Sequence, residues 1–319
     1  MANKTLIHLK ERLDGPIFTI FTPFKEDLSI DYFSIEKYIN YLYEGGARIF
    51  YVMAYNSRYS QLNNHEIMEL NKFCIKCVKS LNNDNVVIVG DPIHCSTQES
   101  IKFALSAYES GGDAISLIMR EKYFSDDQVL EHYSAIGEKA KFPIVIHEMP
   151  FLSGFDGKQM NWPQSLILRL EELDNILAIK EDAKNINVSK LVLSLEPKIR
   201  TIFAGTKKTF LPLKNYGLKS YLNGISIIDA RIGVKFWSFW KANNYDGMDW
   251  IINNLEEPFF GGPVSKYGWH RCNKALLEAA GLMHRRDRMP MPTLKREEFA
   301  EIKSVYLNIK KCIDEQFSK

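Results

Sequence analysis

Between residues 17 and 223, eight short apolar segments recur, and each is followed by a longer stretch with helical spacing of its apolar residues. This alternation is typical of parallel strands joined by crossover helices. Eight repeats is the number that closes a (β/α)8 barrel. The sequence therefore predicts an α/β fold, a (β/α)8 TIM barrel, with strands at 17–22, 47–53, 86–90, 114–119, 144–149, 176–180, 199–204 and 220–223.

The barrel pattern ends near residue 243, and only helical spacing follows it. We assign residues 1–243 to the barrel, which would carry the active site, and residues 244–319 to a C-terminal helical extension. No flexible linker tract separates the two, so the extension should pack tightly on the barrel. Its helices are predicted at 248–257, 266–281 and 295–316, separated by Pro258–Pro263 and Met289–Pro292.

Short polar residues and glycines mark several helix ends in the predicted barrel. Asp31 and Thr97 precede helical stretches and are predicted N-caps, because their side chains can accept hydrogen bonds from the first helical turn. The glycine pairs at 45–46 and 111–112 follow helical stretches, where glycine tolerates the left-handed conformation that ends a helix.

Composition and charge exclude several classes of protein. The 41 basic and 39 acidic residues give a net charge of +2, so there is no electrostatic basis for a nucleic-acid partner. The basic stretch 284–288 is more typical of a solvated connection than of a phosphate-binding patch. No apolar run approaches the roughly 20 residues of a membrane-spanning helix, and residues 1–12 lack a secretory signal. With five cysteines, which suit reduced thiols, a soluble cytoplasmic protein is expected.

Lys180 is the residue with the strongest chemical implication. It falls at the carboxyl end of the sixth predicted strand, where barrel enzymes carry their catalytic groups. A lysine at the mouth of an apolar pocket loses solvation, its pKa falls, and its amine can attack a carbonyl group. This position suggests Schiff-base chemistry, and the alternative is a solvated lysine just past a strand.

Further segments support this interpretation by their order and spacing, namely Gly15–Phe24 followed by Ile30-Asp31, Leu62–Glu66, Ala178–Glu181, Phe203–Gly205 and Lys274–Gly281. Together they resemble the dihydrodipicolinate synthase and N-acetylneuraminate lyase family of Schiff-base barrel enzymes, over nearly the whole chain. The resemblance implies that Lys180 forms an iminium with a 2-oxo acid such as pyruvate. It also implies a lyase, aldolase or dehydratase that needs no metal or organic cofactor and assembles as a homotetramer.

The fifth predicted strand departs from the family pattern. The family usually has Tyr-Asn-x-Pro at its end, with the tyrosine relaying protons beside the lysine, whereas this chain has His147-Glu148-Met149-Pro150. An unperturbed imidazole titrates near pH 6.5, so His147 could itself carry protons. The alternative is a structural histidine that fills space under a loop. Adjacent strand residues point to opposite faces, so Glu148 is expected to face away from His147.

The loop after the second predicted strand departs as well, because Ala54-Tyr55-Asn56-Ser57-Arg58 stands where the family has Gly-Thr-Thr-Gly-Glu. The resemblance places Tyr55 on the threonine of the proton relay. We hypothesise that this phenol works with His147 in a rearranged relay, and a packed or solvent-facing Tyr55 is the alternative. Asn56 and Ser57 are candidate contacts for the substrate carboxylate. Arg58 could add a bidentate clamp if it points inward, and otherwise faces solvent.

The identity of the substrate is less constrained. True dihydrodipicolinate synthases carry an arginine where this chain has Leu152, so lysine biosynthesis is not the expected task. Tyr123 weakly matches a family tyrosine in the fourth loop. Aromatic candidates near the barrel mouth, which indicate a partly apolar pocket, are Phe151, Phe155 and Tyr216.

Two other functions stay open at this point. The altered motifs are compatible with a protein that has kept the lysine but lost turnover, and that binds or senses a 2-oxo acid. A barrel acting on phosphate-bearing substrates is the other possibility, because Gly205-Thr206-Lys207-Lys208 follows the seventh strand. Within the Schiff-base interpretation, Gly205 is a candidate substrate-binding residue.

Overall fold

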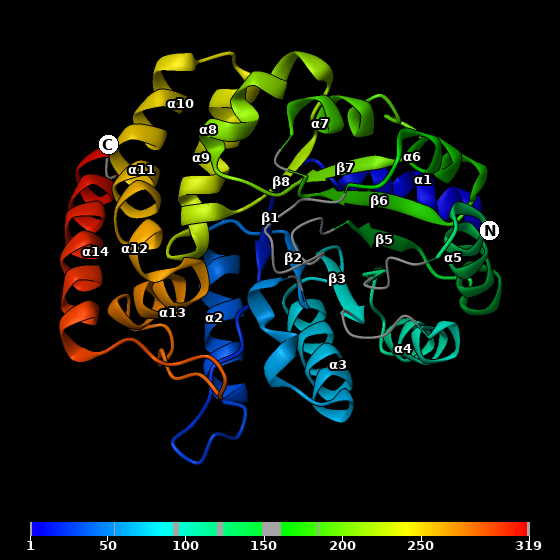
Figure 1. Cartoon of the computed structure of the whole chain (residues 1–319). Coiled ribbons are helices and arrows are strands. Elements are labelled where there is room, and N and C mark those ends of the chain that lie inside the picture. Colours follow the sequence, from blue (N-terminus) through cyan, green and yellow to red (C-terminus); the bar gives the residue numbers. More distant parts are fainter. Residues whose placement is uncertain are drawn as a thin grey trace.

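The computed structural model of the protein describes residues 2–53, 55–91, 96–119, 124–148, 161–183 and 185–317. Eight parallel strands form a closed barrel in chain order, with β1 paired to β8 (Figure 1). The strands are β1 (Gly15–Thr19), β2 (Ile49–Tyr51), β3 (Val86–Asp91), β4 (Ala114–Leu117), β5 (Ile144–His147), β6 (Ile176–Glu181), β7 (Arg200–Phe203) and β8 (Ser220–Leu222). The predicted (β/α)8 barrel and its eight strands are confirmed, although the strand boundaries shift by a few residues.

The barrel is surrounded by helices that follow the strands. They are α2 (Tyr32–Glu44), α3 (Asn64–Leu81), α4 (Thr97–Glu109), α5 (Asp126–Ala140), α6 (Gln164–Arg169), α7 (Ile186–Leu193), α8 (Lys207–Phe210) and α9 (Ala230–Lys241). Apolar residues of these helices pack on the outward faces of the strands in one large buried cluster. A second, smaller cluster fills the inside of the barrel and includes Ile17, Tyr51 and Ala178.

The helix ends predicted within the barrel agree with the structure except at the start of α4. The Asp31 side chain accepts a hydrogen bond from the Ser34 amide, 3.2 Å away, as expected of an N-cap. The predicted cap at Thr97 is wrong, because Ser96 caps α4 by accepting from the Glu99 amide. Thr97 lies one residue inside the helix, where its hydroxyl contacts His132 Nδ1 at 2.9 Å. The glycines predicted to end α2 and α4 include two with left-handed backbones, at positions 46 and 111.

The helix α1 (Ala2–Arg12) was not predicted from the sequence, and it packs against the residues inside the barrel. Its buried leucines Leu6 and Leu9 join the cluster inside the barrel, together with Leu13. The Arg200 side chain at the start of β7 donates to the Lys10 carbonyl at 2.8 Å. α1 therefore packs at the amino ends of the strands, opposite the carboxyl ends where (β/α)8 enzymes have their sites.

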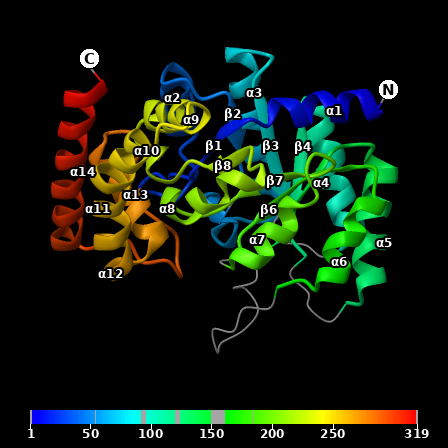
Figure 2. The ribbon, with the colours of Figure 1, turned by 90° about the horizontal axis from the view of Figure 1, so that it is seen from above.

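The C-terminal extension contains α10 (Tyr245–Ile251), α11 (Glu257–Phe259), α12 (Ser265–Tyr267), α13 (Trp269–Ala279) and α14 (Arg296–Phe317). Figure 2 places α14 at one side of the molecule and α1 toward the other. The predicted break at Pro258–Pro263 is wrong, because the chain stays helical from α10 to α12. Two π-helical turns, Ile252–Glu256 and Phe260–Val264, connect the three helices, and such wider turns can accommodate a proline. The helix ends instead at Gly268, which has a φ of 88°.

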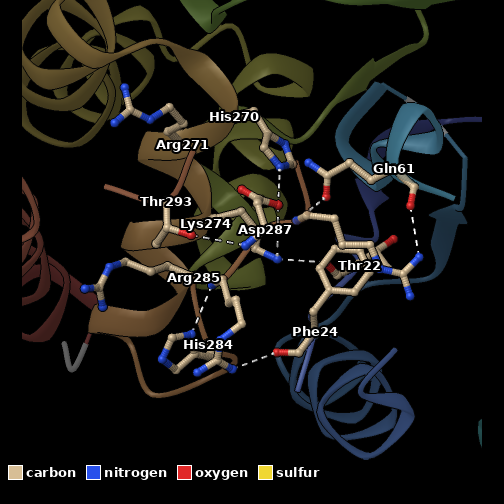
Figure 3. A network of polar contacts seen from close by, with 12 residues as sticks. Thr22, Phe24, Gln61, His270, Arg271, Lys274, His284, Arg285, Asp287 and Thr293 are labelled. Carbon is tan, nitrogen blue, oxygen red and sulfur yellow. Dashed lines mark hydrogen bonds and ion pairs between the residues drawn. The ribbon is translucent and has the colours of Figure 1, made fainter. Parts of the chain in front are cut away.

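A buried polar network docks this extension on the barrel (Figure 3). The Lys274 ammonium of α13 donates to the Thr22 carbonyl at 2.7 Å, and His270 Nε2 lies 3.1 Å from the Asp287 carboxylate. Arg288 forms two 2.8 Å hydrogen bonds with the Glu66 carboxylate of α3. The stretch 284–288 is therefore not the solvated connection that the sequence predicted. It ties the extension to the loop after β1 and to α3.

No helix within the described residues is long and apolar enough to cross a membrane.

Candidate active site

Lys180 lies inside the barrel near the carboxyl end of β6. Ala178 belongs to the inner cluster and Ile179 to the outer one, so the alternation of the strand from residue 178 onward turns Lys180 inward. The residue is 1% exposed, which rules out the alternative of a solvated lysine. A lysine amine buried at this end of a barrel has the position that Schiff-base chemistry requires.

His147 is the neighbour of Lys180 on β5. The two residues are register partners in the parallel ladder, so their side chains emerge side by side. His147 Nε2 lies 2.5 Å from Lys180 Nζ. Burial, and after it the charge of Lys180, hold the pKa of His147 well below its usual range. The imidazole is therefore neutral near pH 7, and its Nε2 accepts a hydrogen bond from the ammonium.

A third group completes this cluster. The Asp182 carboxylate lies 3.2 Å from Lys180 Nζ, and the residue is 6% exposed. Asp182 follows Lys180 by two positions, so the strand period brings both side chains to the same face. Asp182 was not among the residues predicted from the sequence, although its spacing from Lys180 was a usable signal. We call Lys180, His147 and Asp182 the lysine cluster.

Glu148 and Glu181, by contrast, face outward. Both line a small cavity beside Trp162 and Ile179, between the barrel and helices α6 and α7. The prediction that Glu148 faces away from His147 is therefore confirmed. The Glu181 carboxylate accepts hydrogen bonds from the Ala183 amide at 2.6 Å and from the Ser189 hydroxyl at 2.9 Å.

Tyr51 adds a phenol to the interior of the barrel. It points inward from the end of β2, and its hydroxyl is hydrogen-bonded to the Ser116 hydroxyl of β4. Burial raises the pKa of Tyr51, and the charge of Asp182 adds to this effect, while the hydrogen bond with Ser116 opposes it. The phenol is therefore protonated over the working range of most enzymes. The sequence analysis did not select this residue, because a tyrosine in an apolar strand is typical of a core.

Asn56 lies near the ends of β1 and β8 and is held by two partners. Its Oδ1 accepts from Trp269 Nε1 of α13 at 2.8 Å, and its Nδ2 donates to the Thr19 hydroxyl at 2.7 Å. The orientation of the amide follows from its neighbour, because an indole N–H can only donate. The Thr19 hydroxyl then donates to Asn223 Oδ1 at 3.2 Å. The extension thus fixes a candidate substrate contact at the barrel mouth.

Ser57 and Arg58 are engaged with the scaffold. The Ser57 hydroxyl donates to the Ile20 carbonyl at 2.5 Å and accepts from the Met53 amide at 2.9 Å. Its single proton is therefore committed to the backbone, so any contact of Ser57 with a carboxylate would use its main chain. Arg58 is partly buried with a left-handed backbone. Its charge contributes to the low pKa of His270, after burial and the opposing effect of Asp287, so it lies on the side of the extension.

Gly205 follows β7 in a tightly packed segment. A Cβ atom there would lie 2.5 Å from the Thr209 hydroxyl and 2.7 Å from the Phe203 ring, so a side chain does not fit. Lys207, in the same motif, is buried and paired with the Glu256 carboxylate at 3.0 Å. Its ammonium is therefore not presented to a phosphate group, which argues against the alternative of a phosphate-bearing substrate.

The sequence matches the Dihydrodipicolinate synthetase family over residues 12–308. The chain belongs to this family. It is therefore an enzyme of the lyase class, of the class I aldolase type.

Relatives of this family member align with it over most of its length. The 4-hydroxy-tetrahydrodipicolinate synthase of Archaeoglobus fulgidus is 23% identical over 295 residues, which cover 92% of this chain and 96% of the relative. The enzyme of the same name from Lactobacillus acidophilus is 27% identical over 293 residues, covering 90% and 89%.

Solved structures of the family share the fold. A dihydrodipicolinate synthase from Bacillus clausii superposes with a TM-score of 0.81 at 19% identity, covering 95% of this chain and 99% of the other. An N-acetylneuraminate lyase from Fusobacterium nucleatum superposes with a TM-score of 0.80 at 17% identity, covering 93% and 99%. The two enzymes carry different names on one architecture, so the fold alone does not select the substrate.

Several predicted residues of this family member cannot be compared with the structure. Tyr123, Phe151, Leu152 and Phe155, together with the side chain of Tyr55, lie outside the described residues. Tyr216 is 46% exposed, and the Lys190 ammonium stacks on its ring at 4.7 Å. It is therefore a surface residue of the segment Leu211–Tyr216.

Proposed function

We propose that this protein is a Schiff-base-forming lyase, aldolase or dehydratase that acts on a 2-oxo acid of the pyruvate type through an iminium on Lys180. The observation that carries the proposal is the contact of 2.5 Å between a buried lysine amine and a neutral imidazole, at the carboxyl ends of the barrel strands. A nucleophilic amine must lose a proton before it attacks, and an adjacent imidazole is a group that can take it.

His147 has the properties of this proton carrier. The charge of Lys180 is one cause of the low pKa of His147, so the imidazole becomes more basic once the lysine has given up its proton. The imidazolium can then return the proton to the carbinolamine hydroxyl, which leaves as water. This role takes the place of the tyrosine that the family resemblance led us to expect at the end of β5. Tyr55 stays a candidate second carrier.

The carboxylate of the oxo acid is proposed to bind at the segment Tyr55–Ser57, with Asn56 as its side-chain contact. Support comes from the amide of Asn56, whose Nδ2 carries two protons, only one of which is needed by Thr19. The backbone of Ser57, the Arg58 guanidinium and the backbone of Gly205 are further candidate contacts. No metal or organic cofactor is needed for this chemistry.

The partner of the oxo acid is proposed to differ from that of the 4-hydroxy-tetrahydrodipicolinate synthases. The support is the sequence alone, in which Leu152 replaces the expected arginine. From the resemblance we also propose a cytoplasmic homotetramer. The difference in substrate can be tested by steady-state assays of 4-hydroxy-tetrahydrodipicolinate formation. Efficient turnover in these assays would overturn it.

The experiment that tests the proposed function is trapping of the iminium. The protein is incubated with pyruvate, reduced with borohydride and mapped by peptide mass spectrometry. We expect one adduct, on Lys180, that is absent from a Lys180→Met variant. A Lys102→Met variant is the matched control, because Lys102 is an exposed lysine of α4. A wild-type protein without an adduct on Lys180 would refute the proposal.

Trapping also separates catalysis from ligand sensing. An adduct on Lys180 together with cleavage, condensation or dehydration of a panel of sugar-derived and hydroxylated oxo acids supports an enzyme. An adduct without turnover of any panel member supports the alternative, a family member that binds or senses a 2-oxo acid.

A further inference from the structure

Within the described residues, Lys180 Nζ contacts two acceptors of different kinds. One is the neutral imidazole of His147, at 2.5 Å, and the other is the carboxylate of Asp182, at 3.2 Å. Both acceptors are buried, at 1% and 6% exposure. An imidazole can accept a proton near neutral pH, whereas an ionised carboxylate chiefly supplies a fixed negative charge. The two neighbours therefore act on different steps of any reaction at this nitrogen.

A buried negative charge favours those states of its neighbour that are positive. Two states of Lys180 are cationic, the resting ammonium and the iminium, and two are neutral, the free amine and the carbinolamine. The carboxylate therefore opposes release of the first proton and favours the final loss of water. Its net effect is to stabilise the iminium relative to the carbinolamine that precedes it.

We propose that Asp182 is a catalytic residue that serves as the counter-ion of the Lys180 iminium. The proposal rests on the proposed function, because it requires that Lys180 forms the iminium. His147 moves the protons and Asp182 holds the charge. The resting ion pair between Lys180 and Asp182 is then the precursor of an iminium and carboxylate pair at the same place.

The steps balance with these groups alone. The ammonium gives a proton to His147 Nε2, and the free amine attacks the 2-oxo carbon while the carbonyl π electrons move to oxygen. One proton shifts from nitrogen to that oxygen and gives the carbinolamine. The imidazolium then protonates the hydroxyl, the C–O bond breaks and water leaves. One positive charge is present at the start, on the ammonium, and one at the end, on the iminium.

The other ionisable groups described near Asp182 fit this role. Tyr51 reaches the interior from β2, and the negative charge of Asp182 is one reason why its phenol stays protonated. Glu181, the next carboxylate along β6, faces the outer layer and bonds to Ala183 and Ser189. The two adjacent carboxylates therefore lie on opposite sides of the barrel wall. This difference provides a matched control for experiments on Asp182.

The test compares the variants Asp182→Asn, Asp182→Glu and Glu181→Gln with the wild type. Each is incubated with pyruvate over a range of pH, and the rate and the equilibrium level of borohydride-trapped adduct on Lys180 are measured. For Asp182→Asn we expect a level at least tenfold lower at subsaturating pyruvate and alkaline pH, where the resting amine is neutral and iminium formation creates the positive charge. We also expect its rate profile to shift to lower pH, because the ammonium loses the carboxylate that holds its proton. Asp182→Glu should recover part of the level, and Glu181→Gln should match the wild type.

The outcomes separate the two proposals. A wild type without any adduct overturns the proposed function, and the counter-ion role with it. A wild type with an adduct and an Asp182→Asn variant with the same level and pH profile overturns only the role of Asp182. A variant that forms the adduct faster without lowering its level also overturns that role, because the carboxylate would then merely lock the ammonium. If Asp182→Asn does not fold, Asp182→Ser removes the same charge in a smaller side chain.

Discussion

Replacing Lys274 by methionine should remove a rise in the free energy of unfolding that we expect of the wild type at alkaline pH. Lys274 is fully buried between the barrel and the extension, where its Nζ donates to the Thr22 carbonyl at 2.7 Å and lies 3.7 Å from the Asp287 carboxylate (Figure 3). Burial lowers the pKa of Lys274 from 10.5 to about 8, against the opposing effect of Asp287. In the unfolded chain the amine regains its ordinary pKa.

The sign and size of the effect follow from these two pKa values. Between pH 8 and 10.5 the unfolded chain holds a proton that the folded protein has released, so the free energy of unfolding increases with pH. Below this window both states are protonated, and above it neither is. The window spans 10.5 − 8 = 2.5 pH units. At about 1.4 kcal/mol per unit, the gain across it is about 3 kcal/mol.

The assay is urea unfolding of the wild type and of Lys274→Met at pH 7.5 and pH 10.5. Methionine has a similar length and no titrating group, so we expect the difference in free energy of unfolding to change by about 3 kcal/mol in favour of the wild type at the higher pH. Lys208→Met is the matched control, because that ammonium is exposed and paired with Glu257 at the surface. A difference between wild type and Lys274→Met that is equal at both pH values would refute the reasoning.

Three further predictions concern the site. His147→Phe keeps a planar ring but removes the proton acceptor, so the rate of adduct formation with pyruvate, followed by timed borohydride quenching, should fall by about a hundredfold or more; a wild-type rate would exclude His147 from the relay. Tyr55→Phe should depress turnover strongly while the adduct stays detectable, and unchanged turnover would contradict the rearranged relay. Trp269→Phe leaves the amide of Asn56 without its donor, so the KM for the oxo acid should rise about tenfold with a smaller change in kcat, as expected when a weak hydrogen bond that orients a binding group is lost. An unchanged KM would separate Asn56 from substrate binding.

The fold could be predicted to a large extent because its signals are local. Each strand is a short apolar run between polar or glycine-containing segments, so eight of them could be counted without knowledge of their partners. The errors arose where a local signal has two structural outcomes. Pro258 and Pro263 usually end helices, yet here π-helical turns accommodate them. The helix α1 was missed because its leucines can be recognised as core residues only once the barrel end that they cover is known.

The site was predictable only in part. Lys180 was found from its place at the carboxyl end of a predicted strand, and His147 because it stands where the family resemblance puts a tyrosine. Asp182 could have been found by the same periodicity. The orientation of the Asn56 amide could not have been predicted, because the donor that fixes it is Trp269, which lies 213 positions away in the sequence. The commitment of the Ser57 hydroxyl to the Ile20 carbonyl likewise depends on how two strand ends approach each other.

Three lysines in the described part of the chain are almost completely buried, and each has a carboxylate partner. Asp182 is the partner of Lys180, Glu256 that of Lys207, and Asp287 that of Lys274. Burial beside a carboxylate therefore does not distinguish the proposed nucleophile from the other two buried lysines.

Among the described residues, the other hydrogen-bond acceptor of each ammonium does distinguish the three lysines. Lys207 and Lys274 donate to the backbone carbonyls of Asn223 and Thr22, which cannot take up a proton near neutral pH, whereas Lys180 donates to the imidazole of His147. Even Lys274, with a pKa near 8, does not donate to the imidazole in its network, because His270 bonds to Asp287 instead. Pyruvate and borohydride should therefore label Lys180 and leave the other two unmodified. An adduct on either of them would mean that a buried amine reacts without an imidazole, and that the contact with His147 is not what makes Lys180 a nucleophile.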